Sequence, residues 1–141
     1  MSVLLAHGSP DPQHGRAVEG QARLLREQGT AVSVAYLDHQ GPTLAEATAN
    51  LGEDVVVIPL LLSHAYHSHV DVPREIAALH RPIRLASGWL TDEIVIASLL
   101  ARLPAEIYSD EAVVVVTAGS SDAQALADLL HWAWLQPFYP E

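Results

Sequence analysis

The sequence contains no cysteine and no lysine, and no apolar run approaches the roughly 20 residues that a membrane-spanning helix needs. Without cysteine there is no disulfide, no thiolate metal site and no iron–sulfur cluster, so any metal must be held by nitrogen and oxygen donors. The segment after Met1 is strand-like and lacks the basic residues and small-residue cleavage site of a signal peptide. We therefore expect a cytoplasmic protein with no membrane partner.

Positive charge is also scarce, because 7 arginines oppose 17 acidic residues and the formal net charge is −10. Nucleic-acid phosphates are contacted by clustered Lys and Arg, so we expect no nucleic-acid partner. Histidine, in contrast, is frequent, with 8 in 141 residues, and His64, His67 and His69 fall in one short stretch. Half of the residues are apolar, which is enough for one folded domain of ordinary size.

Short apolar runs alternate with helical patterns over most of the chain. Strands are predicted at 3–6, 31–37, 54–62 and 83–86, and helices over 12–28, from 43 to near 52, from about 71, and over 91–103. Asp11 before Pro12 is typical of a helix start, and Thr43 with Glu46 fits a capping box. Pro59 removes a backbone donor and predicts a ladder end or an irregularity. The alternation predicts an α/β fold, namely a flavodoxin-like parallel sheet with helices on both faces and strand order 2-1-3-4.

A second copy of the first strand–helix unit is predicted near the end of the chain. The residues at 6–13 read AHGSPDPQ and those at 117–124 read TAGSSDAQ, each after an apolar run. We predict a complete α/β unit over 1–104, a partial second repeat over 111–131 packed on the same sheet, and an aromatic tail over 132–141. Ala118 takes the place of His7, so the second copy lacks any chemistry that this histidine carries.

Candidate metal ligands follow three predicted strands at their carboxyl ends. His7 follows the first strand, Asp38 the second, and His64, His67 and His69 the third. Ligands bind at this edge of a parallel sheet, and adjacent strands are only about 4.8 Å apart, so these side chains can converge on one ion. Two imidazoles and a carboxylate suit Co²⁺, Fe²⁺, Ni²⁺ or Zn²⁺ and leave coordination positions open. Taken singly, His7 could be a packed or capping histidine and Asp38 an ordinary loop carboxylate. The three histidines at 64, 67 and 69 could simply belong to a solvated loop.

The turn formed by Gly8 and Ser9 before a helix also suits an anion, which backbone N–H groups can bind. The sequence has neither the glycine count of a dinucleotide fingerprint nor the lysine of a P-loop, and the pattern Gly-x-Ser-x-Gly does not occur. Nucleotide binding and a serine-hydrolase mechanism are therefore disfavoured.

Three separated motifs resemble the class II tetrapyrrole chelatases, the group of sirohydrochlorin cobaltochelatases and ferrochelatases. They are LLAHGSPDP at 4–12, AYLD at 35–38 with PTLAEA at 42–47, and VVIPLLLS at 56–63 with YHSHVDVP at 66–73. The resemblance runs from residue 2 to about 103. It implies a lyase-type metal chelatase that inserts Co²⁺ or Fe²⁺, or in some members Ni²⁺, into sirohydrochlorin or a related tetrapyrrole. The metal is then a substrate, and neither ATP nor an organic cofactor is required. The product serves cobalamin or sirohaem biosynthesis.

By the same resemblance, His7 and His67 correspond to the paired histidines of the family and are the expected catalytic residues. Asp38 stands where many members have Glu, and it completes the expected metal ligands. His69 falls where Arg or Lys is common, and His64 where small residues are common. Further expected contacts to the metal or the substrate are made by His64, His69, Ser9, Arg16 and Arg74.

A single unit covers only one face of a flat macrocycle, which predicts a homodimer or pairing with a second chelatase-like unit. The main alternative is a non-catalytic carrier or sensor of divalent metal that uses the histidine-rich loop. An anion-binding module built on Gly8 and Ser9 is a third hypothesis.

Overall fold

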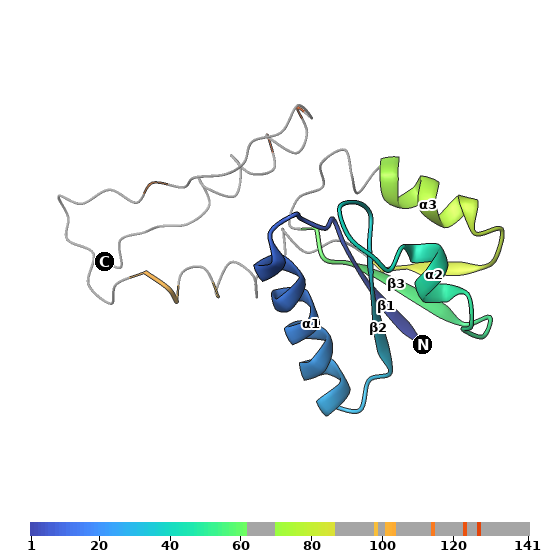
Figure 1. Cartoon of the computed structure of the whole chain (residues 1–141), viewed down its shortest axis with the longest axis horizontal. Coiled ribbons are helices and arrows are strands. Elements are labelled where there is room, and N and C mark those ends of the chain that lie inside the picture. Colours follow the sequence, from blue (N-terminus) through green and yellow to red (C-terminus); the bar gives the residue numbers. More distant parts are fainter. Residues whose placement is uncertain are drawn as a thin grey trace.

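One parallel sheet forms the centre of the described structure. The computed structural model describes residues 1–61 and 70–86 and, beyond these, only 98, 101–103, 114, 123 and 127. Its four strands are β1 (Ser2–Ala6), β2 (Val32–Tyr36), β3 (Val55–Pro59) and β4 (Ile83–Leu85). All pairings are parallel, in the order β2-β1-β3-β4 (Figure 1). This confirms the strand order and the fold class that the sequence predicts.

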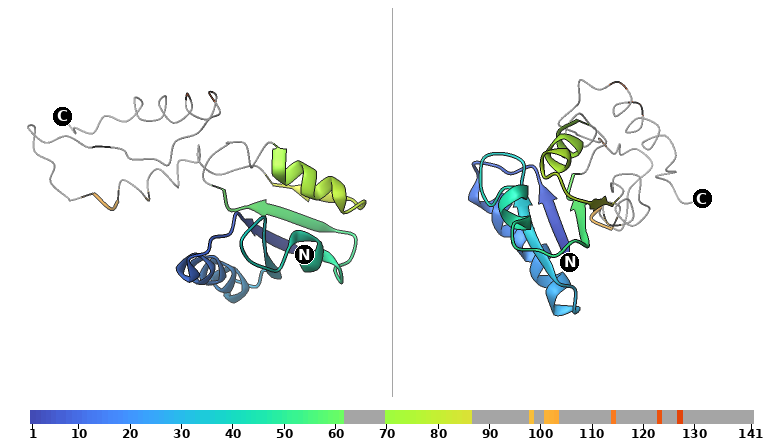
Figure 2. Two further views of the ribbon diagram at one scale, coloured as in Figure 1. Left: turned by 45° about the horizontal axis from the view of Figure 1, so that its top comes forward. Right: turned by 90° about the vertical axis from the view of Figure 1, so that its right-hand side faces the viewer.

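The helices cover both faces of this sheet. Helix α1 (Pro12–Glu27) packs on one face, whereas α2 (Leu44–Thr48) and α3 (Val72–Ala78) pack on the other. Figures 1 and 2 show the helices outside the strands from several directions. Since α1 leads from β1 to β2 and α2 leads back across to β3, right-handed crossovers require these two helices to lie on opposite faces.

Side-chain caps start the first two helices, as the sequence predicts. The carboxylate of Asp11 accepts the backbone N–H of Gln13 at 2.8 Å, and Pro12 follows at the start of α1. Thr43 and Glu46 form the complete capping box of α2. The third start differs from these, because the Asp71 side chain caps no backbone group of α3.

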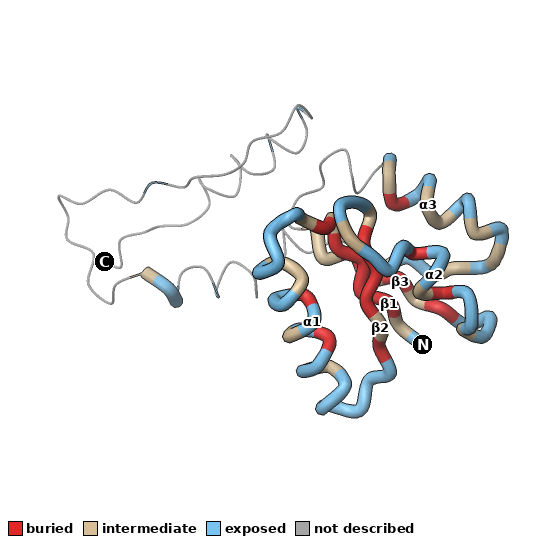
Figure 3. Tube along the Cα trace, viewed as in Figure 1, coloured by how far each residue is buried: buried red, intermediate tan, exposed pale blue. Residues whose placement is uncertain are grey.

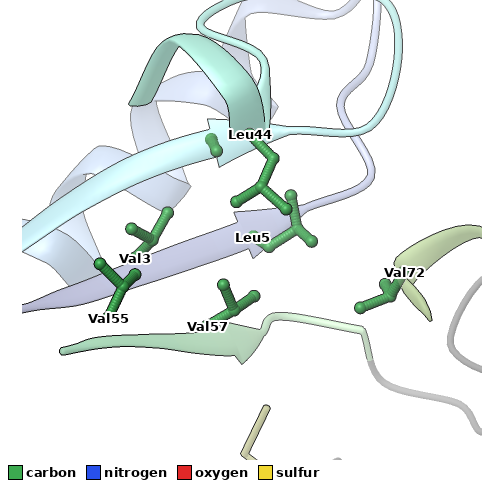
Figure 4. Close-up of a cluster of buried hydrophobic side chains, with 7 residues drawn as sticks. Val3, Leu5, Leu44, Val55, Val57 and Val72 are labelled. Carbon is green, nitrogen blue, oxygen red and sulfur yellow. The ribbon is translucent and has the colours of Figure 1, made fainter. Parts of the chain in front are cut away.

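The core forms two clusters, one on each side of the sheet, because successive residues of a strand point to opposite faces. Figure 3 shows buried residues concentrated along the strands and on the sides of the helices that face them. Val3 and Leu5 of β1 point toward α2 and α3 and pack with Leu44 and Val72, as Figure 4 shows. The alternate residues of β1 and β2 pack against Val18 and Ala22 of α1.

Pro59 is the last residue of β3, so the strand ends earlier than the predicted residue 62, and Pro59 marks a ladder end rather than an irregularity. The following Leu60 N–H still donates to the carbonyl of Leu5 at 2.8 Å. The chain therefore leaves β3 at the same edge of the sheet as the loops after β1 and β2. The histidine-rich stretch at 64–69 comes next and lies outside the described residues.

The predictions for the second part of the chain fall mostly outside the described residues. Ser98, within the helix predicted over 91–103, is helical. Val114 belongs to the apolar run 113–116 that opens the predicted second repeat, where a further strand is expected, but it is in no strand and is 78% exposed. The partial repeat over 111–131 and the tail over 132–141 stay predictions. Among the described residues, no helix is long and apolar enough to cross a membrane.

Candidate metal centre

The loops after β1 and β2 are held together by backbone hydrogen bonds that continue past both strands. Leu37 N–H donates to the carbonyl of Ala6 at 3.0 Å, and Asp38 N–H donates to the carbonyl of His7 at 2.8 Å. His7 and Asp38 are therefore neighbours at the carboxyl edge of the sheet. The order of the strands predicts this adjacency, and the two hydrogen bonds beyond the strand ends hold it in the backbone.

Gly8 allows the first loop to approach the second closely. Its φ is +94°, a conformation that residues with a side chain rarely adopt. A Cβ atom at this position would overlap the carbonyl oxygen of Asp38. Position 8 is therefore restricted to glycine by both the backbone conformation and the neighbouring loop.

A tight turn centred on His39 follows Asp38. Gln40 N–H donates to the carbonyl of Asp38 at 2.8 Å, and His39 has a positive φ of 63°. One carboxylate oxygen of Asp38, Oδ1, accepts the backbone N–H of His39 at 2.7 Å. The other, Oδ2, lies 3.8 Å from His39 Nε2. The imidazole of His39 thus lies beside the carboxylate of Asp38, and its ring centroid is 5.9 Å from that of His7.

The tautomer of His7 follows from its contact with the backbone. Nδ1 of His7 lies 3.2 Å from the carbonyl oxygen of Gly8. Because a carbonyl oxygen can only accept, Nδ1 must carry the proton in this hydrogen bond. In the neutral ring the lone pair is then on Nε2, which is the atom that can bind an ion or accept a proton.

A cavity of about 110 Å³ opens beside these residues and is lined by His7, Leu37, Asp38, Asp71, Arg74 and Glu75. It therefore lies between the β1 and β2 loops and the start of α3. Carboxylates outnumber the guanidinium group in the lining, and such a surface attracts a cation more than an anion.

The charge of Arg74 is largely compensated by its neighbours on α3. Its Nη2 atom lies 3.0 Å from Asp71 Oδ1 and 3.8 Å from Glu75 Oε1. The Asp71 side chain is only 16% exposed, so this part of the cavity wall is an ion pair rather than an isolated cation. Arg74 is therefore a weaker candidate for a substrate carboxylate than the sequence indicates.

The other residues expected to contact the metal or the substrate do not line the cavity or lie outside the described residues. Ser9 Oγ accepts the backbone N–H of Asp11 at 3.1 Å, so its side chain stabilises the turn before α1. Arg16 is exposed on α1 and does not line the cavity. His64, His67 and His69 lie outside the described residues, and so their place at the site stays a prediction.

Within residues 1–61 and 70–86, no three His, Asp or Glu side chains are already grouped as metal ligands. A three-ligand centre on His7 and Asp38 therefore needs a further donor or a rotation of side chains. This is the place that the sequence assigns to His67.

Sequence reasoning did not single out His39, Asp71 or Glu75. Only His39 had a usable signal, since it directly follows a candidate ligand. The two acids are placed at the cavity by the packing of α3, which a linear sequence does not display.

Comparison with known proteins places this chain in a family. The family model of CbiX matches residues 1–109. The sirohydrochlorin cobaltochelatase of Methanopyrus kandleri is 33% identical over 78 residues, which cover 51% of this chain and 54% of that protein. The sirohydrochlorin cobaltochelatase of Saccharolobus solfataricus is 33% identical over 76 residues, 51% of this chain and 59% of the relative. The matched segment thus spans little more than half the length of these curated relatives.

A solved structure agrees with these matches. It is a CbiX protein from Marinobacter aquaeolei VT8 whose name gives a provisional role in cobalamin (vitamin B12) biosynthesis. It superposes with a TM-score of 0.58 at 28% sequence identity, covering 70% of this chain and 88% of that one. The strand order, the motifs and the family match together lead to one conclusion: the chain belongs to the CbiX family.

Proposed function

We propose that the protein is a metal chelatase that inserts Co²⁺ into sirohydrochlorin or a closely related tetrapyrrole. The observation that carries this proposal is the pair formed by His7 and Asp38, which the backbone holds together beside an acid-lined cavity. Such a site suits a divalent cation. The relatives' names supply the macrocycle and the metal, since both are sirohydrochlorin cobaltochelatases.

The reaction exchanges two pyrrole protons for one divalent ion, which is a substrate rather than a resident cofactor. Nε2 of His7 can bind the incoming ion or accept a proton from the macrocycle, because Nδ1 is occupied by the carbonyl of Gly8. The carboxylate of Asp38 balances the charge of the ion next to that ring. We propose His67 as the second histidine of the reaction, on the basis of its position in the sequence motif.

Fe²⁺ and Ni²⁺ are further candidate ions, because nitrogen and carboxylate donors accept all three metals. We also propose that the reaction needs no ATP, as the resemblance to the class II chelatases implies. We propose a lyase-type reaction for any of these ions. The metal in the product decides whether it serves cobalamin or sirohaem biosynthesis.

Binding of the macrocycle requires positive charge, since sirohydrochlorin carries many carboxylates and this chain has a net charge of −10. Arg74 is paired with Asp71 and Glu75, so it has little charge to offer. We propose Arg16 for this contact, because it is exposed near the start of α1, at the edge of the sheet where the cavity lies. Replacing Arg16 with Gln should raise KM for the tetrapyrrole and leave Co²⁺ affinity unchanged.

The test is insertion of Co²⁺ into sirohydrochlorin, followed by the absorbance change of the macrocycle. We expect the protein to accelerate insertion over the spontaneous rate, and His7→Asn to lose most of this acceleration. His80→Asn is the matched control, because His80 lies at the end of α3 and does not line the cavity. Tight Co²⁺ binding without acceleration would instead identify a metal carrier or sensor.

We also propose that two copies of the chain, or this chain and a second chelatase-like unit, enclose the macrocycle. Light scattering with and without sirohydrochlorin measures the assembly. A monomer that inserts metal at full rate would exclude this part of the proposal.

A further inference from the structure

His39 is a second imidazole at the carboxyl edge of the sheet. Its ring centroid is 5.9 Å from that of His7, with the ring planes inclined by 46°. Its Nε2 atom is 3.8 Å from Oδ2 of Asp38. The two loops therefore bring two imidazoles and one carboxylate near one another, although these three side chains need rotation before they can share one ion.

We propose that His39 is a further donor to the divalent ion, which binds between His7, Asp38 and His39. The inference deepens the proposed function and rests on it for the identity of the ion. It assigns two of the site's nitrogen donors to the loops after β1 and β2, so that the first encounter with the metal does not require His67.

The separation of the two rings suits a shared ion. A divalent ion lies about 2.1 Å from a coordinating imidazole nitrogen, which places it roughly 3.2 Å from the ring centroid. Two rings on one ion therefore have centroids at most about 6.5 Å apart. The observed 5.9 Å lies within this limit and the rings are tilted rather than stacked, so a modest rotation of either ring brings both nitrogens onto one ion.

The contact between His39 and Asp38 leads to the same conclusion. A separation of 3.8 Å is too long for a hydrogen bond. It is, however, shorter than the roughly 4.2 Å that two donors span on opposite sides of one ion. Direct pairing alone therefore gives little stabilisation here, whereas an ion between the two groups would contact both.

The backbone holds His39 in an uncommon conformation. Its φ of 63° is left-handed, and few residues other than glycine adopt it without cost. The carboxylate of Asp38 and the carbonyl of Asp38 each accept one backbone N–H of this turn. The side chains of Asp38 and His39 are 68% and 45% exposed, so both can rotate toward an incoming ion.

Co²⁺ titration of the full chain without tetrapyrrole tests this inference. His39→Asn removes the imidazole while keeping a side chain that tolerates positive φ. His80→Asn is the matched control, because His80 also has a positive φ, of 50°, but follows the end of α3 that lies away from the cavity and from Asp38. We expect His39→Asn to weaken Co²⁺ binding by at least about tenfold, and His80→Asn to bind as the parent does. Proton NMR of the Co²⁺-bound protein should lose one paramagnetically shifted imidazole signal in His39→Asn only.

The outcomes separate this inference from the proposed function. If His39→Asn binds Co²⁺ as tightly as the parent with the same shifted signals, His39 is a solvated loop residue and the inference is wrong, even when insertion proceeds normally. If the parent binds Co²⁺ through His39 but never accelerates insertion, the chelatase proposal fails and the donor assignment stands. A parent that binds no Co²⁺ would overturn both.

Discussion

The carbonyl oxygen of Asp38 lies against Gly8, in the space that a Cβ atom at position 8 would occupy. This contact joins the loops that carry His7 and Asp38, and it depends on the absence of a side chain.

Gly8→Ala should separate the two loops. The added methyl group must displace the carbonyl of Asp38, and the alanine must keep a φ of +94°. Together these two effects cost on the order of 1–3 kcal/mol. We expect a lower Tm and loss of most Co²⁺ affinity. Gly20→Ala is the control, because a Cβ atom there meets nothing within 4 Å and alanine favours the helix. Equal Co²⁺ affinity in both variants would show that the loop contact is unimportant for the site.

Asp38→Asn should weaken Co²⁺ binding by at least about tenfold, because it removes the negative charge next to His7 while nearly keeping the shape. Asp54→Asn removes the same charge in an exposed surface pair with Arg84 and should have no effect. Isothermal titration with Co²⁺ measures both variants. Asp38→Glu should retain binding if charge is the requirement. It should lose binding if the short side chain is needed for the 2.7 Å hydrogen bond to the N–H of His39.

Arg81→Met should destabilise the protein more than Arg84→Met. The half-buried Arg81 guanidinium donates to the carbonyls of Thr48 at 3.0 Å and Leu51 at 3.1 Å, and to that of Gly52, after the last turn of α2. Loss of these charge-assisted hydrogen bonds removes the Arg81 donor from the carbonyls of Leu51 and Gly52, whereas that of Thr48 keeps the N–H of Leu51, and it should cost on the order of 1–3 kcal/mol in urea unfolding. Arg84 forms an exposed ion pair with Asp54, and its loss should cost less than about 1 kcal/mol. Equal losses would contradict this assignment.

The capping box of α2 should make stability depend on pH. Hydrogen bonds from the backbone and side chain of Thr43 hold the pKa of Glu46 below its ordinary value. The folded state therefore binds the Glu46 proton more weakly than the unfolded state. The stabilisation is present above about pH 4–5 and is lost as the pH falls through the lowered pKa.

Glu46→Gln keeps an acceptor for the cap but has no titrating group. Its Tm should be below that of the parent at pH 7, and the difference should shrink as the pH falls below the ordinary glutamate pKa of about 4.5. Glu53→Gln changes an exposed carboxylate outside the capping box and should follow the parent at every pH. A constant difference between parent and Glu46→Gln across this range would refute the linkage.

Local sequence chemistry predicts most of the fold. Asp11 and Thr43 cap the helices that they are expected to start, because a cap depends only on residues within one turn. The apolar strands and the right-handed crossover rule leave few strand orders, and the observed one is among the simplest. The adjacency of His7 and Asp38 follows from that order without further information.

The rest of the site depends on tertiary packing. The contribution of Asp71 and Glu75 to the cavity requires knowledge of where α3 lies on the sheet. The position of the His39 ring depends on a positive φ that sequence patterns do not indicate for histidine. The position of Arg74 near the site is predictable from the sequence, but its ion pair with Asp71 is not.

The hydrogen bond from Asp38 N–H to the carbonyl of His7 has a consequence for kinetics. Because this bond ties the two loops together just beyond the ends of β1 and β2, the backbones at these two positions cannot move apart without breaking it. An ion bound there must therefore enter and leave by side-chain rotation, which takes place in picoseconds to nanoseconds at exposed positions, whereas collective movements take microseconds or longer. The speed of metal exchange should accordingly be set by dehydration of the ion rather than by a movement of the protein.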